Sequence, residues 1–71
     1  MKLPRDLSGD DVVRALKRLG FVVVRQVGSH VRLARGDARV TVPAHNAIVP
    51  GTLKSILRQA GVSVEQLLAA L

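Results

Sequence analysis

His30 is the residue whose type and setting best suit chemistry in this chain of 71 residues. It follows a Gly-Ser pair, and arginines precede and follow it, among them Arg25, Arg32 and Arg39. An imidazole can accept a proton near pH 7, and its conjugate acid can return one. RNA carries its own nucleophile, the 2′-hydroxyl, so its cleavage needs only a proton acceptor, a proton donor and positive charge for the phosphorane. The pattern predicts His30 as a catalytic residue acting on RNA; the alternative is a histidine that only binds phosphate or packs at a turn.

Other polar residues could bind the same substrate. His45 could act as the acid to His30 as base, or it could only bond the backbone or cap the next helix. Ser29 could polarise His30 or bind phosphate, although a Gly-Ser pair is more often turn chemistry. Lys54 lies where the start of a helix could seat a phosphate, or where its neighbours only cap that helix. We therefore take six residues as candidates for RNA binding: Arg25, Ser29, Arg32, Arg39, His45 and Lys54.

The composition excludes several other kinds of site. The chain has no cysteine, which excludes disulfides, thiolate metal sites and cysteine nucleophiles and favours a reducing compartment. Two histidines without Asp, Glu or Cys at ligand spacing make a poor metal site, and no glycine motif for a nucleotide is present, so we expect neither metal nor cofactor. Without a long apolar run or a signal peptide, the chain is expected to be cytoplasmic, with no membrane partner.

The charge balance indicates a polyanionic partner. Lys and Arg total 11 against 5 Asp and Glu, a net charge of +6. Most of the acids fall at predicted helix starts or turns, where carboxylates support local structure, so the remaining surface is more uniformly positive. Nucleic acid, a membrane surface or an acidic protein would match this charge. With one aromatic residue, recognition of RNA by backbone and shape is favoured over base stacking.

The elements that must position these residues can be read in order. A helix is predicted over residues 9–19, with Ser8 and Asp11 as a capping box and Gly20 as its stop. Strands are predicted over residues 21–26, 30–35 and 38–42, since β-branched residues dominate there and Pro43 ends the last one. Helices follow over residues 51–60 and from 64 to about 70, the second with Ser63 and Gln66 as a capping box.

The two hairpins differ in how well the sequence defines them. A two-residue loop at Gly36-Asp37 places Leu33 opposite Val40 and Val31 opposite Val42, all facing the core, and puts His30, Arg32, Arg39 and Thr41 on the opposite, polar face. For the first hairpin, a two-residue loop would bury Val22 and Val24, and a three-residue loop would bury Phe21 and Val23. We prefer the three-residue loop, because a small core needs the only aromatic side chain.

The expected fold class is therefore α+β, in the order α-β-β-β-α-α. It consists of one domain, residues 1–71, with a three-stranded antiparallel sheet and the helices packed on one face.

Several motifs, in this order, resemble the HicA toxin family, also called the YcfA-like family. They are Gly28-Ser29-His30, Val42-Pro43-Ala44-His45, Gly51-Thr52-Leu53 and residues 56–63. The resemblance covers nearly the whole chain. It implies a fold like a double-stranded RNA-binding domain, ribosome-independent cleavage of mRNA, a HicB antitoxin partner that blocks the active face, and His30 as the catalytic histidine of the Gly-Ser-His motif.

Two alternatives use the same basic face. It could belong to a non-catalytic RNA-binding module, which would bind RNA and leave it full length. It could also belong to an adaptor whose positive face meets only an acidic protein, in which case binding to RNA would be lost at modest salt.

Overall fold

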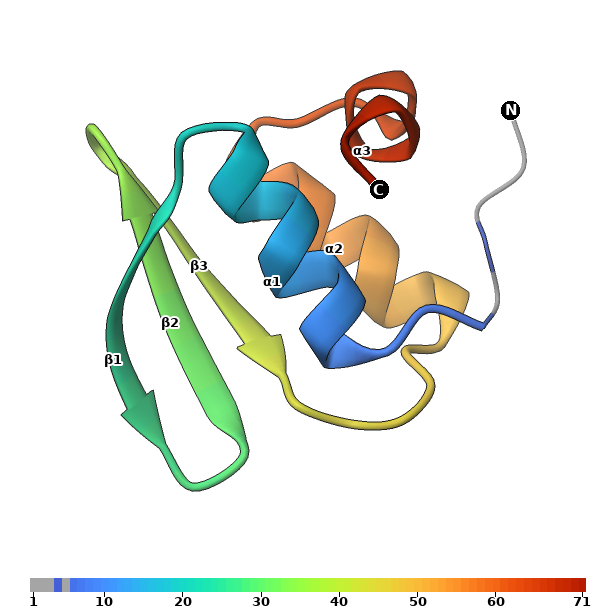
Figure 1. Ribbon diagram of the computed structural model, residues 1–71, viewed down its shortest axis with the longest axis horizontal. Helices are drawn as coiled ribbons and strands as arrows, with labels where there is room; N and C mark the ends of the chain where they lie inside the picture. Colours follow the sequence, from blue (N-terminus) through green and yellow to red (C-terminus); the bar gives the residue numbers. More distant parts are fainter. Residues whose placement is uncertain (1–3, 5) are drawn as a thin grey trace.

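A computed structural model describes residue 4 and residues 6–71 of the chain (Figure 1). The elements in order are α1 (Gly9–Arg18), β1 (Val22–Val27), β2 (His30–Arg35), β3 (Ala38–Pro43), α2 (Pro50–Ala60) and α3 (Val64–Ala70). The strands form one antiparallel sheet in the order β1-β2-β3, and the helices lie to one side of it (Figure 1). The expected α+β architecture is confirmed.

The first helix begins where the capping pattern predicts. The Ser8 hydroxyl accepts a hydrogen bond from the Asp11 amide at 3.1 Å, and the Asp11 carboxylate accepts one from the Ser8 amide at 3.0 Å. These two bonds satisfy amide groups that a helix start would otherwise leave without partners. The chain leaves the helix in a turn at Gly20, whose φ of 99° favours glycine. Its buried stripe includes Val12 and Leu16, which fixes α1 against the core.

The hairpin of β2 and β3 has the predicted register. Leu33 pairs with Val40 and Val31 pairs with Val42, and all four side chains are buried. Because side chains alternate between the two faces of a strand, the residues between them face away from the helices. This single hairpin therefore supplies core residues on one face of the sheet and polar residues on the uncovered face.

The prediction for the first hairpin is wrong in two respects. Val27 pairs with His30, so the loop has two residues, Gly28 and Ser29, with Gly28 at φ 58°. Val23, expected in the core, is 41% exposed. The register shifts between Val23 and Arg25, which identifies a β-bulge, and the extra residue breaks the simple alternation on which the prediction relied.

Phe21 is buried, as expected, although it precedes β1 instead of lying within it. The Arg35 guanidinium lies 4.6 Å from the centre of its ring and donates a hydrogen bond to the Leu19 carbonyl oxygen at 2.7 Å. Arg35 thus joins the end of β2 to the turn after α1. Its positive charge serves the fold, through a cation–π contact and a backbone bond.

The last two helices complete the core. The α2 helix ends at Gly61, which has the left-handed φ of 68°, and α3 begins with the predicted capping box between Ser63 and Gln66. The α3 helix packs on α1, where Arg18 donates to the Ala70 carbonyl oxygen at 3.0 Å. Leu67 of α3 is fully buried, whereas Leu71, just beyond the helix, is exposed.

The segment between β3 and α2 is pinned to the N-terminal side of α1. The Gly9 amide donates to the His45 carbonyl oxygen at 2.8 Å, and the Ile48 amide donates to the Leu7 carbonyl oxygen at 2.7 Å. The Ile48 side chain is almost wholly buried, a role that the sequence pattern did not reveal. These contacts hold the loop that carries His45 in a defined place.

Candidate nucleic-acid interface

The sheet face that the helices leave uncovered carries the polar residues of β2 and β3. His30 and Arg32 alternate with buried Val31 and Leu33 along β2, and Arg39 and Thr41 alternate with buried residues along β3. Arg25 of β1 pairs with Arg32 and so lies on the same face. The structure thus brings together His30 and the three arginines named from the sequence.

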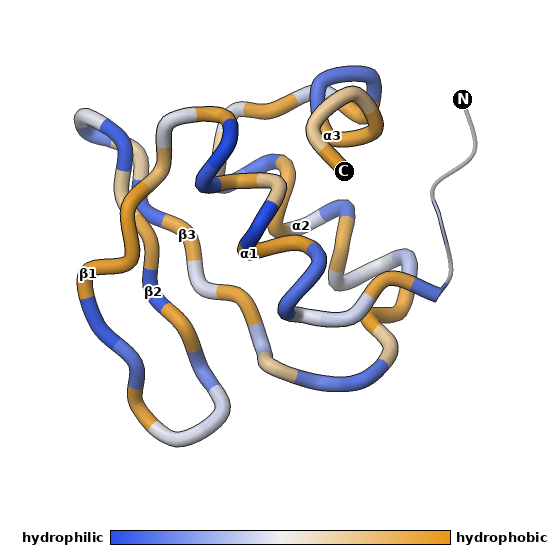
Figure 2. The backbone as a smooth tube through the Cα atoms, in the orientation of Figure 1, coloured by the Kyte–Doolittle hydropathy of each residue, from blue (hydrophilic) through white to orange (hydrophobic). Residues whose placement is uncertain are grey.

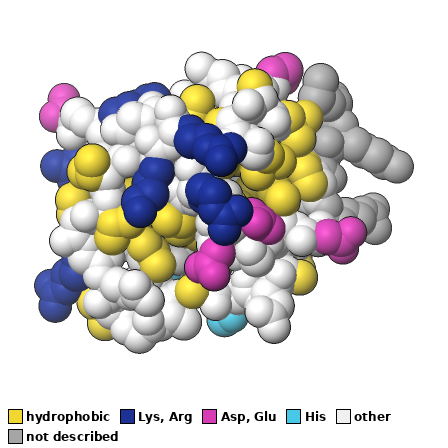
Figure 3. Space-filling view, viewed as in Figure 1, with side chains coloured by type: hydrophobic (Ala, Val, Ile, Leu, Met, Phe, Trp, Pro, Cys, Tyr) yellow, Lys and Arg dark blue, Asp and Glu magenta, His cyan; other side chains and the backbone are white. Residues whose placement is uncertain are grey.

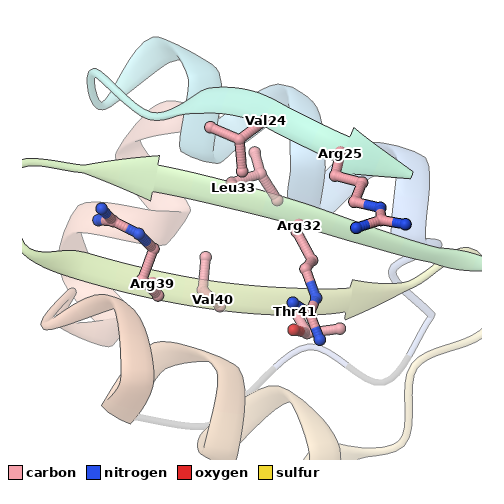
Figure 4. A pocket seen from close by; sticks show the side chains of 7 residues that line it. All are labelled: Val24, Arg25, Arg32, Leu33, Arg39, Val40 and Thr41. Atoms are coloured by element: carbon pink, nitrogen blue, oxygen red, sulfur yellow. The ribbon is translucent and has the colours of Figure 1, made fainter. Parts of the chain in front are cut away.

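A hollow of about 460 Å³ lies in the middle of this face (Figure 4). Its lining comes from all three strands and consists of Val24, Arg25, Arg32, Leu33, Arg39, Val40 and Thr41. The Arg32 side chain reaches from β2 toward Thr41 on β3 (Figure 4). Guanidinium groups beside the exposed side chain of Val24 suit a ligand that combines phosphate with less polar parts, such as a nucleotide. Val24 enters this lining through the bulge, which no local sequence signal identified.

The three arginines of the hollow are held differently. Arg39 donates to the Gly36 and Ala38 carbonyl oxygens, at 2.7 and 3.0 Å, so its guanidinium is tied to the β2–β3 turn. For Arg25 and Arg32, no hydrogen bond or ion pair to the part of the chain that the structure describes is found. Their donors are therefore available to an external anion, and an arginine fork suits phosphate well.

His30 stands at the first position of β2, exposed, between Val27 and Pro43. It is two residues from Arg32 on the same face, which corresponds to about 7 Å along a strand. It lies beside the hollow and does not line it. An imidazole in this position can meet a phosphodiester whose neighbouring nucleotide occupies the hollow.

Ser29 and His45 lie at the same end of the sheet as His30. The Ser29 carbonyl oxygen accepts a hydrogen bond from the Ala44 amide at 2.6 Å, so the first hairpin turn and the loop after β3 are in contact there. Both side chains are exposed. Lys54 is also exposed, but it belongs to α2 and not to the sheet, so the structure does not bring it onto the uncovered face.

A second basic surface lies over α1. Figure 3 shows Lys and Arg side chains gathered over this helix, with hydrophobic side chains on either side. Its members are Arg14, Lys17 and Arg18. Arg14 is 3.5 Å from the Asp11 carboxylate and Arg18 is bonded to Ala70, so two of the three cations already have partners. The α1 residues of this surface include no histidine, so it is a weaker candidate for a catalytic site than the sheet face.

Two further properties bear on the kind of site. Within residue 4 and residues 6–71, no group of three or more His, Cys, Asp or Glu side chains could hold a metal ion. In the same part of the chain, no helix has the length and apolar character needed to cross a membrane.

Comparison with protein families assigns the class of protein. A family model described as the HicA toxin of bacterial toxin–antitoxin systems matches residues 9–62, from the start of α1 to just beyond α2. The match covers more than half of the chain and includes all three strands and His30. The chain belongs to the HicA toxin family. No curated protein matches it.

Proposed function

We propose that this protein is the toxin of a type II toxin–antitoxin system and acts in the cytoplasm as a metal-independent endoribonuclease on mRNA. The observation that carries the proposal is the position of His30, exposed on the uncovered sheet face two residues from Arg32. Membership of the HicA toxin family supports the role of toxin. The net charge of +6 supports a polyanionic substrate.

The proposed reaction uses the nucleophile that RNA supplies. His30 accepts the proton of a 2′-hydroxyl, and that oxygen attacks the adjacent phosphorus. The bond from phosphorus to the 5′-oxygen breaks, and this oxygen takes a proton from an acid, for which His45 is the candidate. The products are a 2′,3′-cyclic phosphate and a 5′-hydroxyl. No metal is required, because guanidinium groups can stabilise the charge of the phosphorane.

The other candidates have a binding role in this proposal. Arg32, without a protein acceptor among the described residues and nearest to His30 on β2, faces the reacting phosphate, and Arg25 and Arg39 hold flanking phosphates around the hollow. Ser29 contacts the backbone of the RNA beside His30. Lys54 contributes attraction from outside the sheet face. The inhibitory partner is a HicB-like antitoxin that covers the uncovered face.

The decisive experiment combines a variant with a modified substrate. His30→Ala is expected to abolish cleavage of RNA in the presence of a chelator while leaving RNA binding and the melting temperature close to wild type, since His30 is exposed. Wild-type protein is expected to bind, and not cut, an RNA whose 2′-hydroxyls are replaced by hydrogen. Cleavage by His30→Ala at the wild-type rate would falsify the role of His30.

The non-catalytic alternative gives a different result in the same assay. An RNA-binding module would shift RNA on a native gel and leave it full length at every protein concentration. Products that end in a 2′,3′-cyclic phosphate exclude that alternative.

A further inference from the structure

The outer edge of the sheet is exposed and apolar along β1. All six residues of β1 are exposed, and Val22, Val23, Val24 and Val27 are between 41% and 59% accessible. Figure 2 shows this hydrophobic stretch at the margin of the molecule. An edge strand of this kind offers main-chain donors and acceptors to another chain, and proteins usually protect such edges with lysine, proline or a covering element. On β1, the bulge at Val24 and the charge of Arg25 are the protective features.

The opposite edge of the same sheet is covered. The α2 helix lies beside β3 (Figure 1), and the Thr41 amide donates to the Gln59 side-chain oxygen at 3.4 Å. A main-chain group of that edge is therefore satisfied within the molecule. The contrast between the two edges shows that the fold closes one side of the sheet and leaves the other open.

The register identifies which main-chain groups of β1 face outward. In a hairpin with a two-residue loop, the two residues that flank the loop form a hydrogen-bonded pair. Along the ladder, hydrogen-bonded pairs then alternate with pairs whose main-chain groups point away from the partner strand. Val27 and His30 are the flanking pair, so the next pair, Gln26 and Val31, is not hydrogen-bonded. The amide and carbonyl of Gln26 therefore point away from β2. The same alternation on the other strand places the Thr41 amide outward, where its bond to Gln59 is observed.

The charges around β1 discriminate between two candidate partners for this edge, a second copy of the chain and a segment of a different protein. A second copy would bring two chains of net charge +6 together and would place Arg25 beside a like-charged surface. An extended segment with carboxylates on one face would instead meet Arg25, and Arg32 behind it, while its apolar side chains lie on the other face, that of Val23. Complementarity therefore favours an acidic strand from a different protein.

We propose that the edge of β1 binds an extended acidic segment of a partner protein, which adds a strand to the sheet. The identity of that partner as the antitoxin rests on the proposed function; the strand addition itself does not. Val24 and Arg25 belong both to this edge and to the lining of the hollow. A segment bound there would lie beside the proposed RNA site and compete with RNA for Arg25.

The surface can be tested with defined peptides. Isotope-labelled protein is titrated with a short acetylated peptide in which valine alternates with glutamate, and amide shifts are followed by NMR. We expect shifts along β1, with the Gln26 amide gaining protection from hydrogen exchange. A peptide in which lysine replaces glutamate, and one methylated on alternate backbone nitrogens, should each bind at least about tenfold more weakly.

Matched variants distinguish binding of the peptide at the β1 edge from nonspecific binding elsewhere on the protein. Gln26→Pro removes the outward donor without removing a bond to β2, and is expected to weaken binding of the glutamate peptide by about tenfold. Val22→Glu should act similarly, because its carboxylate would repel the glutamates of the peptide. Val49→Glu is the control, because Val49 is equally exposed, at 60%, but lies before α2 and away from the sheet. Melting curves establish that each variant is folded.

Several outcomes overturn the inference. They are equal binding of the methylated peptide, shifts confined to other elements, and no binding by the wild type. A dimer in sedimentation that Gln26→Pro abolishes would identify a second copy as the occupant and would also overturn it. The peptide assay contains no RNA, so its result is independent of whether the protein cleaves RNA; loss of cleavage in His30→Ala tests that separately.

Discussion

The Ser29 carbonyl oxygen and the Ala44 amide are joined by a hydrogen bond of 2.6 Å between the first hairpin turn and the loop after β3. Each residue directly precedes a histidine, His30 on one side and His45 on the other. The two histidines, distant in sequence, therefore stand at one end of the sheet. In the proposed reaction, these histidines are the base and the candidate acid for one phosphodiester.

His45→Ala should lower the rate of RNA cleavage by about a hundredfold if His45 donates the proton to the leaving oxygen. Binding of RNA should change little. The alkaline side of the pH–rate profile should flatten in this variant, whereas residual activity in His30 variants should lose the acidic side. An unchanged pH–rate profile in His45→Ala would assign the proton donor to water or another group.

Arg32→Gln should weaken RNA binding and reduce the slope of log affinity against log salt by about 1, because one phosphate contact is lost. The free energy of unfolding should stay near the wild-type value, since Arg32 is exposed and no partner for it is found among residue 4 and residues 6–71. Affinity measured over a range of salt concentrations checks the first expectation, and denaturant titration checks the second.

Arg35→Gln should show the opposite behaviour and so serves as the contrasting variant. It removes the bond to the Leu19 carbonyl oxygen and the contact with the Phe21 ring. We expect a loss of about 1 kcal/mol in the free energy of unfolding and an unchanged salt slope. A reduced salt slope in this variant would mean that Arg35 leaves Phe21 to bind RNA.

Gly9→Ala should destabilise the fold by about 2–3 kcal/mol. A β-carbon at Gly9 would overlap the Pro43 carbonyl oxygen and come within 2.7 Å of the Ala44 α-carbon, both of which are main-chain atoms with little freedom to move. Gly51→Ala is the matched control near the start of α2, where nothing lies within 4 Å. It should gain about 0.5–1 kcal/mol, since alanine favours helix. Equal effects of the two changes in denaturant titration would contradict this.

The capping box of α1 should make the melting temperature depend on pH in the acidic range. Hydrogen bonds from the Ser8 amide and hydroxyl, and then the charge of Arg14, lower the pKa of Asp11 from its ordinary value of 3.8. The Asp11 carboxyl thus binds its proton less tightly in the folded protein than in the unfolded chain. The ionised carboxylate therefore stabilises the fold above pH 3.8, and this stabilisation is lost as the pH falls through the lowered pKa. Asp11→Asn should flatten the dependence of melting temperature on pH in that range. A dependence as steep as that of the wild type would exclude Asp11 as its source.

Local chemistry was enough to predict much of this fold. The capping boxes at Ser8 and Ser63 and the stop at Gly61 involve residues within four positions of each other, so the sequence pattern contains all the partners. The β2–β3 register followed from a short loop and two agreeing alternations. The same register predicts that His30 and Arg32 share one face, because side chains alternate along a strand with a period of two.

The first hairpin shows where local reasoning failed. The run of valines in β1 has no alternation to define a buried face, and the bulge at Val24 has no sequence signal of its own. The hollow, whose lining includes Val24, therefore could not be predicted. The same holds for Arg35, whose guanidinium the packing places against the Phe21 ring.

The sequence by itself determined the order of the elements, their caps, the β2–β3 register and the chemical character of the residues on the uncovered face, since each depends on neighbours along the chain. The tertiary structure alone decided that β3 is covered by α2 while β1 remains open, that Ile48 anchors the loop of His45, and that this loop is bonded to the turn before His30. Those features depend on contacts between residues far apart in the sequence, whose geometry arises only when the helices pack on the sheet.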